Sequence, residues 1–221
     1  MDVKPVSYLL LFIFGTFFLV VYTITRDDYF YTFSKPLFIG VILCFYLVTS
    51  YRQIDLWFIF SLLFLGYAGA ALLYDNANAH FQTIVATSLG YLIFLRFAWL
   101  ELRKIPRHRF KYRDLPIVLL LITLLFYIVY SNSVGSLGDL SKVAFIHGCV
   151  VITFSSLAFF NFLTIPTKRA MWLMFVAIAF ILGDVFFLIY EFQSDILFIR
   201  QVNYIARITS HIFMLRFIMA K

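Results

Sequence analysis

Long apolar runs recur along this chain, and they constrain its fold more than any other feature. A bilayer core about 30 Å thick needs about 20 apolar residues in a helix, because each residue advances a helix by about 1.5 Å. Runs of roughly 17–25 such residues predict about eight transmembrane helices, near residues 6–25, 36–51, 55–74, 81–101, 115–131, 140–164, 170–191 and 196–219. We therefore expect an all-α, polytopic membrane helix bundle.

The composition supports one integral membrane domain that covers residues 1–221. Of the 221 residues, 63% are hydrophobic and 13% are charged, whereas a soluble domain is about half apolar and about a quarter charged. Strand-like alternation over about ten residues does not recur, which argues against an outer-membrane barrel. Cys44 and Cys149 lie inside apolar runs, so neither a disulfide framework nor a thiolate metal site is expected. The first run is long and has no small-residue cleavage site after it, which favours a spanning helix over a signal peptide.

The basic residues predict the orientation of the chain in the membrane. The connection between the fourth and fifth runs is the most basic segment, with Arg103, Lys104, Arg107, Arg109, Lys111 and Arg113. In an eight-helix count the same side of the membrane receives Arg52, Lys168, Arg169 and Lys221, while the opposite loops are neutral or acidic. Lys and Arg in short loops stay cytoplasmic, so both termini are expected there. The basic connection could also bind anionic lipid headgroups or RNA, but its position favours a role in topology alone.

Ionisable residues interrupt the last two apolar runs. Asp184 lies in the seventh run, and Arg200, Arg207 and His211 lie in the eighth. Charged groups at membrane depth are costly, and they mark functional sites by default. At about 100° per residue, the three basic positions and Tyr204 fall within about 60° of one another on a helix. The two runs form a hairpin, so we expect this polar stripe to face Asp184.

The depth of these residues predicts an ion pair. Asp184 and the segment between Arg200 and Arg207 are about equally far from the outer ends of their helices, so Asp184 can pair with either arginine. Such a pair either locks two helices together or serves catalysis, and the sequence leaves both alternatives open. Glu191 and Arg200 lie nearer the interface, where long side chains extend toward water.

Two histidines fall at similar depths in the predicted bundle. His147 in the sixth run lies near the level of Asp184, and His211 lies deeper. Together they could supply metal ligands, but no HxxxH or HxxE spacing occurs on one helix, so neither a metal ion nor another cofactor is expected. Serines that could complete a Ser-His-Asp arrangement are available, without a local motif to support it: Ser155, Ser156 and Ser210.

Short motifs accompany this layout of eight runs: Lys35-Pro36-Leu37 at the start of the second run, Phe60-Ser61-Leu62-Leu63 in the third, Phe180-Ile181-Leu182-Gly183-Asp184 in the seventh, and a Tyr-bearing final helix. In these features the chain resembles the YhhN-like lysoplasmalogenase family of membrane proteins. The family usually carries Gly-Asp where this chain has Gly66-Tyr67, and a His where it has the segment 88–91. Of these polar landmarks, Asp184 is retained.

The resemblance implies hydrolysis of the vinyl ether bond of lysoplasmalogens, with release of a fatty aldehyde. Under this hypothesis the catalytic candidates are Asp184, His147 and His211. The candidates for binding a lysophospholipid-like substrate are Arg200, Tyr204, Arg207 and Tyr67. A protonated buried carboxylic acid would suit the first step, whereas a guanidinium beside Asp184 would favour the carboxylate and could hold a lipid phosphate instead.

A second hypothesis remains open, namely a non-catalytic lipid-binding or small-molecule transport bundle of the same fold. Both hypotheses imply a membrane lipid or small molecule as the ligand rather than nucleic acid. The short loops favour a multi-pass protein of a bacterial inner membrane. The sequence does not predict an oligomeric state.

Overall fold

The computed structural model describes residues 5–25, 27–50, 53–73, 78–106, 108, 114–193 and 196–220. All regular elements within these ranges are helical. The α-helices are α1 (Pro5–Thr25), α2 (Asp28–Thr49), α3 (Leu56–Ala71), α4 (Ala79–Arg103), α5 (Asp114–Leu137), α6 (Ser141–Thr164), α7 (Lys168–Phe192) and α8 (Leu197–Met219), and a short 3-10 helix η2 (Gly138–Leu140) joins α5 to α6. The predicted all-α fold is confirmed.

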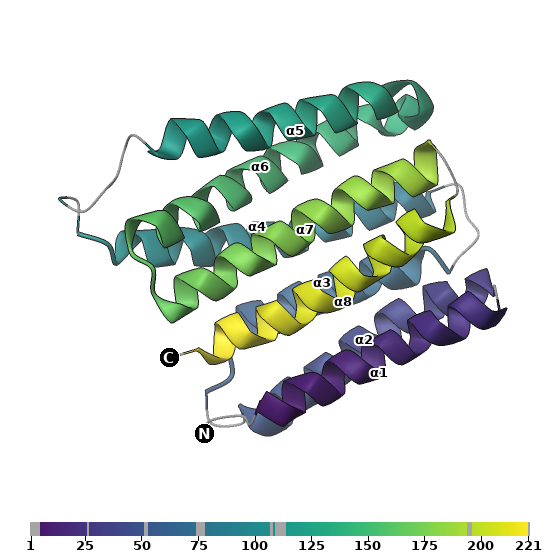
Figure 1. Cartoon of the computed structure of the whole chain (residues 1–221), viewed down its shortest axis with the longest axis horizontal. Helices are drawn as coiled ribbons and strands as arrows, with labels where there is room; N and C mark the ends of the chain where they lie inside the picture. Colours follow the sequence, from purple (N-terminus) through teal and green to yellow (C-terminus); the bar gives the residue numbers. More distant parts are fainter. Residues whose placement is uncertain are drawn as a thin grey trace.

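Successive helices run in opposite directions along one bundle, and both chain ends lie at the same end of it (Figure 1). The helices α1 and α5 lie at opposite edges of the bundle, and α4 packs between α3 and α6. The hairpin of α7 and α8 is the most extensive contact between two helices, and α8 also packs against α1 and α2. The polar hairpin therefore lies where the first and second halves of the chain meet.

A cluster of aromatic rings fills the interior between the hairpin and the helices α4 and α6. Phe94 of α4, Phe154 of α6, Phe180 of α7 and Phe217 of α8 are each at most 1% exposed. Phe94 packs edge-on against Phe180, with ring centroids 5.8 Å apart, and against Phe154 at 6.1 Å. Edge-to-face pairs of this kind are favourable beyond the area they bury. The cluster fixes the spacing of four helices beside the polar residues.

Helix α2 begins earlier than the predicted range of 36–51. It starts at Asp28, so Pro36 lies inside the helix rather than at its start. An interior proline removes one backbone hydrogen bond, which membrane helices tolerate where neighbouring helices adjust. Gly69 of α3 approaches this point closely, since a Cβ there would lie 3.3 Å from both Lys35 Cβ and Pro36 Cδ. Lys35 is therefore a helical residue inside the bundle and not part of a loop.

Helix α5 is longer than the predicted range of 115–131, because its polar C-terminal part remains helical. Asn132 Nδ2 donates to Ile128 O at 2.8 Å, and Ser133 Oγ donates to Val129 O at 2.9 Å. Polar side chains that bond the preceding turn are satisfied locally, so they need not end a helix. By contrast, α3 is shorter than the predicted range of 55–74.

The outer surface of the bundle is apolar. Leu10 of α1, Leu120 of α5 and Phe198 of α8 are 60%, 68% and 67% exposed, which is unusual for contiguous faces of a soluble protein. Five segments of the described chain are long and apolar enough to cross a membrane by length and composition: Val6–Thr25, Thr32–Thr49, Ala79–Arg103, Leu115–Thr164 and Lys168–Phe192. The fourth segment contains both α5 and α6. The chain is a helical membrane protein.

Basic residues gather at the end of the bundle that carries both termini. Here Glu101 at the end of α4 accepts from Lys104 Nζ at 2.7 Å and forms an ion pair with Arg169 of α7, with Nε and Oε1 3.0 Å apart. The other basic residues that predict the orientation in the membrane lie outside the described residues: Arg52, Arg107, Arg109, Lys111, Arg113 and Lys221.

The contact between α5 and α6 depends on the absence of a side chain at Gly148. A Cβ at this position would lie 1.8 Å from Cε2 of Phe126. We expect Gly148→Ala to lower the free energy of unfolding by about 1–3 kcal/mol, as overpacking does, and Phe126→Leu to restore part of it in the double variant. Thermal unfolding in detergent measures this. Gly135→Ala on α5, where a Cβ meets nothing within 4 Å, is the control. Equal melting temperatures for the two alanine variants would refute the steric explanation.

Candidate functional site

A network of polar side chains surrounds Asp184 in the middle of the bundle. Arg207 Nη2 of α8 donates to Asp184 Oδ1 at 2.6 Å, and Arg207 Nη1 donates to the Tyr91 hydroxyl of α4 at 2.8 Å. Tyr91 in turn donates to Asp184 Oδ1 at 3.2 Å. The other carboxylate oxygen, Oδ2, lies 3.2 Å from His147 Nε2 of α6. We call these four residues the Asp184 network. Of the two predicted partners of Asp184, Arg207 is the one that pairs with it.

The backbone of α7 is shaped to admit Arg207. A Cβ at Gly183 would lie 3.1 Å from Arg207 Nε, so the glycine beside Asp184 leaves room for the arginine to cross α7. Asn203 of α8 donates to the Gly183 carbonyl at 2.6 Å, which holds the two helices in register at this level. The Gly183-Asp184 pair of the sequence motif therefore has a steric role as well as a polar one.

His147 is also fixed by a second contact, with Ser88 of α4. Ser88 Oγ lies 2.9 Å from His147 Nδ1 and donates to Ile84 O at 2.7 Å. When the serine donates to Nδ1, Nε2 carries the ring proton and donates to Asp184 Oδ2. When the serine donates to Ile84 O, Nδ1 can donate to the serine oxygen. The structure thus contains a Ser-His-Asp chain, built on Ser88 rather than on Ser155, Ser156 or Ser210.

The Asp184 network is largely buried but not sealed. The side chains of Asp184, His147 and Arg207 are 13%, 14% and 22% exposed. Their exposure is explained by an open cavity, which they line together with apolar residues of α5 and α6 such as Phe126 and Val151. We call it the α5–α6 cavity. Ligand sites have this character, with apolar walls and a few convergent polar groups.

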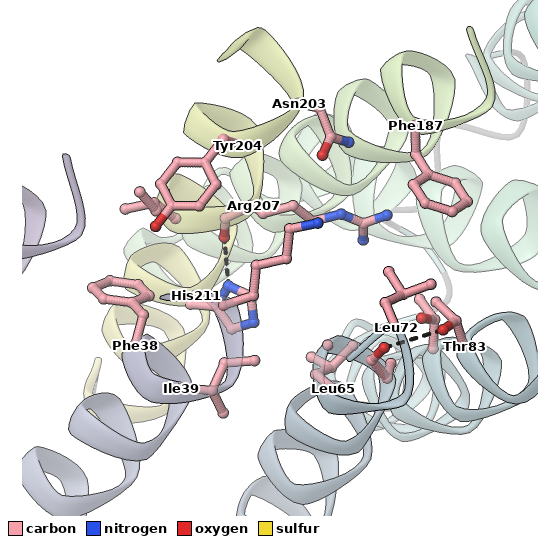
Figure 2. Close-up of a pocket in the computed structure, with 15 residues that line it drawn as sticks. Phe38, Ile39, Leu65, Leu72, Thr83, Phe187, Asn203, Tyr204, Arg207 and His211 are labelled. Carbon is pink, nitrogen blue, oxygen red and sulfur yellow. Dashed lines mark hydrogen bonds between the residues drawn. The ribbon is translucent and has the colours of Figure 1, made fainter. Parts of the chain in front are cut away.

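A second cavity lies on the other side of Arg207 (Figure 2). Its polar lining includes Lys35 of α2 and Arg207, Tyr204 and His211 of α8, and its walls are otherwise mainly apolar. Figure 2 shows the Arg207 side chain extending from α8 along the top of this space. We call it the α2–α8 cavity. Since Arg207 lines both cavities, it is the charged group that they share.

Two of the residues predicted on α8 point into the α2–α8 cavity. Tyr204 is 1% exposed, and its hydroxyl donates to Ser34 Oγ at 2.7 Å. His211 is 6% exposed, and its Nδ1 contacts the backbone carbonyl of Arg207. His211 therefore lies in a different cavity from His147, and the structure does not bring the two histidines together.

Three other polar residues named from the sequence lie apart from the Asp184 network. Arg200 donates to the Tyr22 hydroxyl at 2.6 Å. Tyr67 is 53% exposed and donates to Gln82 at 3.3 Å. Glu191, expected near the interface, contacts His80 Nε2 at 2.6 Å. Neither Arg200 nor Tyr67 is among the residues that line the two cavities.

Sequence reasoning missed the contribution of α4. Ser88 and Tyr91 were noticed only as a departure from a family pattern, yet they hold His147 and Arg207. Ser88 and Tyr91 are three residues apart, so they lie on one face of α4. Two polar residues on one face of an apolar helix were the signal in the sequence. Lys35 was also missed, because the helix was expected to begin after it.

Among the described residues, no group of three or more His, Cys, Asp or Glu side chains is arranged to hold a metal ion. No family model, curated protein or solved structure matches this chain. The site is therefore a buried carboxylate between two cavities. A guanidinium, a phenol and an imidazole all contact this carboxylate. Such a site can move a proton or stabilise a cation.

The ion pair between Asp184 and Arg207 is expected to stabilise the fold. Removing one partner of a buried pair costs up to about 3–5 kcal/mol, because the other charge is left uncompensated. We expect Asp184→Asn and Arg207→Gln each to lower the thermal unfolding temperature, and the double variant to lose less than the sum of the two. Lys104→Ala removes a pair whose lysine is 62% exposed and should change the stability by no more than about 1 kcal/mol. Strictly additive losses at Asp184 and Arg207 would contradict the pairing.

Proposed function

We propose that this protein is a membrane-embedded hydrolase that cleaves the vinyl ether bond of lysoplasmalogen-type lipids. The observation that carries the proposal is the contact between His147 and Asp184 at the wall of a mainly apolar cavity. The resemblance to the YhhN-like family adds support, because two of its motifs lie beside Arg207. Lys35 of the first motif and Asp184 of the other line the two cavities that share Arg207.

The proposed reaction begins when the vinyl ether carbon next to the chain takes a proton, which leaves an oxocarbenium ion. In this proposal the proton that His147 Nε2 donates to Asp184 Oδ2 is the one transferred to this carbon. The Asp184 carboxylate then stabilises the cation electrostatically, as groups fixed before the reaction do best. Water adds to the cation and returns a proton to the pair, and the hemiacetal breaks into a fatty aldehyde and a glycerophospho-alcohol.

The roles of the other candidates follow from where they lie. In this proposal the alkenyl chain occupies the α5–α6 cavity, and Arg207 lies at the boundary where the ether oxygen enters. Tyr204 and His211 line the α2–α8 cavity, so they contact the polar part of the substrate. Substrate binding by Arg200 and Tyr67 stays a prediction that no contact among the described residues supports.

A specific observation also favours a second candidate function, hydrolysis of an ester-linked lipid. The chain from Ser88 through His147 to Asp184 has the order of groups found in serine hydrolases. Against it, Ser88 Oγ donates to Ile84 O and Ser88 is not among the residues lining either cavity. We therefore assign Ser88 to positioning His147.

For the membrane arrangement we propose that all eight helices cross the bilayer and that both termini are cytoplasmic, in a bacterial inner membrane. Both termini lie at one end of the bundle (Figure 1), and Arg103, Lys104, Lys168 and Arg169 belong to the same end. Basic residues at one end favour the cytoplasmic side.

Fusions at the C-terminus test this topology. In a bacterial host, a green fluorescent protein at residue 221 should fluoresce, and an alkaline phosphatase there should be inactive. The same reporters fused after Gln193, between α7 and α8, should give the opposite result. Active phosphatase at residue 221 would overturn the proposed orientation.

Release of aldehyde by purified protein tests the reaction. We expect release from a 1-alkenyl lysophospholipid and none from its 1-alkyl analogue, which has no double bond to protonate. Asp184→Asn should lower kcat by about 10²–10⁴-fold, the usual contribution of a proton-transferring group. Glu101→Gln, at the terminal end of the bundle, is the matched control and should retain activity.

Other outcomes of this assay point to the alternatives. Fatty acid released from a 1-acyl lysophospholipid, and lost in Ser88→Ala, would favour the ester hydrolase. Binding of the alkenyl lipid by folded protein without any product would favour the non-catalytic lipid-binding or transport bundle.

A further inference from the structure

His211 presents an unpaired hydrogen-bond acceptor to the α2–α8 cavity. Its Nδ1 contacts the carbonyl oxygen of Arg207, which can only accept, so Nδ1 carries the proton. In the neutral ring Nε2 then has only its lone pair. This atom is buried and has no hydrogen-bond partner in the described part of the chain. Figure 2 shows the ring beside Phe38 and Ile39, with its second nitrogen turned away from the Arg207 carbonyl.

A buried polar atom without a partner costs about 1–3 kcal/mol, so such atoms in native proteins call for an explanation. His211 is 6% exposed, and it packs edge-on against Phe38 with ring centroids 6.3 Å apart. No donor of the described residues lies within hydrogen-bond distance of Nε2. A ligand hydroxyl that enters the cavity would supply one.

The same cavity has a cationic side. Lys35 lines it together with Arg207, and Lys35 interacts electrostatically with Arg207 and with Arg200. The ammonium group of Lys35 and the guanidinium group of Arg207 are the kinds of group that bind a phosphate.

We propose that the α2–α8 cavity binds the phosphoglycerol part of a single-chain lipid, and that His211 selects lipids with a free hydroxyl next to the ether-linked chain. His211 Nε2 accepts from that hydroxyl, while Lys35 and Arg207 hold the phosphate. This inference rests on the proposed lipid substrate. It adds a specificity-determining residue outside the Asp184 network.

Selectivity follows from the chemistry of the acceptor. When the hydroxyl oxygen is esterified with an acyl chain, the ligand has no proton to donate there and Nε2 is left unpaired. Sites built around a hydrogen bond to a substrate hydroxyl reject analogues that lack it, because the buried polar group then stays unsatisfied. A lipid with two chains is therefore refused for lack of a donor as well as for its size.

Binding to purified protein in detergent tests the proposal without turnover. The probes are a 1-O-alkyl lysophospholipid with a free 2-hydroxyl and the same lipid capped as its 2-O-methyl ether. Neither has a vinyl ether to hydrolyse, and the cap adds only one methyl group. We expect the hydroxyl lipid to bind about tenfold tighter, the effect of one hydrogen bond of about 1.4 kcal/mol.

Variants separate the roles of the two polar groups. His211→Phe should bring the hydroxyl lipid down to the affinity of the capped one, whereas His211→Gln, which keeps an acceptor, should retain part of the preference. Lys35→Gln should weaken both lipids equally and leave their ratio unchanged. Only variants as thermally stable as the wild-type protein are compared. If a variant fails to fold, the ratio of the two lipid affinities measured for the wild-type protein decides the test.

Several results would overturn the proposal. Equal affinities of the two lipids for the wild-type protein would mean that Nε2 is satisfied by water only. An unchanged preference in His211→Phe would place the selecting group elsewhere. Glycerol 3-phosphate bound as tightly as the lipid would indicate a soluble phosphate ligand. Hydroxyl preference without aldehyde release would sustain this inference while the proposed reaction fails, and aldehyde release without the preference would do the reverse.

Discussion

The ion pair between Asp184 and Arg207 joins α7 to α8 at the level where helices from both halves of the chain meet. Neither charge can be buried in a bilayer without the other, so the pair constrains the register of the hairpin. Gly183 leaves room for the arginine to cross α7, and Tyr91 contacts both members of the pair. The remaining polar contacts at this level are arranged around it.

Arg207 also divides the interior into two cavities with different chemistry. The α5–α6 cavity has mainly apolar walls and is lined by His147 and Asp184, whose Nε2 and Oδ2 atoms are in contact. The α2–α8 cavity combines cationic groups with a buried acceptor on His211. An amphipathic ligand with one chain and one phosphate has the same division into an apolar and an anionic part. The match between ligand and protein supports the proposed lipid substrate.

Part of this site was predictable from the sequence. Counting depth along two apolar runs left Arg200 and Arg207 as the possible partners of Asp184, because a charge at membrane depth needs a partner at equal depth. His147 was placed near the same level for the same reason. Tyr67 and Arg200 were also predicted to bind the substrate. In the structure they contact Gln82 and Tyr22 instead. Periodicity gives the face of a helix and not the neighbour that this face meets.

The sequence by itself determined that the chain is helical and apolar enough for a membrane, since the length and composition of each run decide this locally. It also determined that α7 and α8 carry costly charges. Only the tertiary structure decided that α4 completes the site, because Ser88 and Tyr91 lie far along the chain from Asp184 and meet it through packing. The orientation of His211 was likewise decided by packing, which turned one ring nitrogen to its own helix and left the other for the cavity.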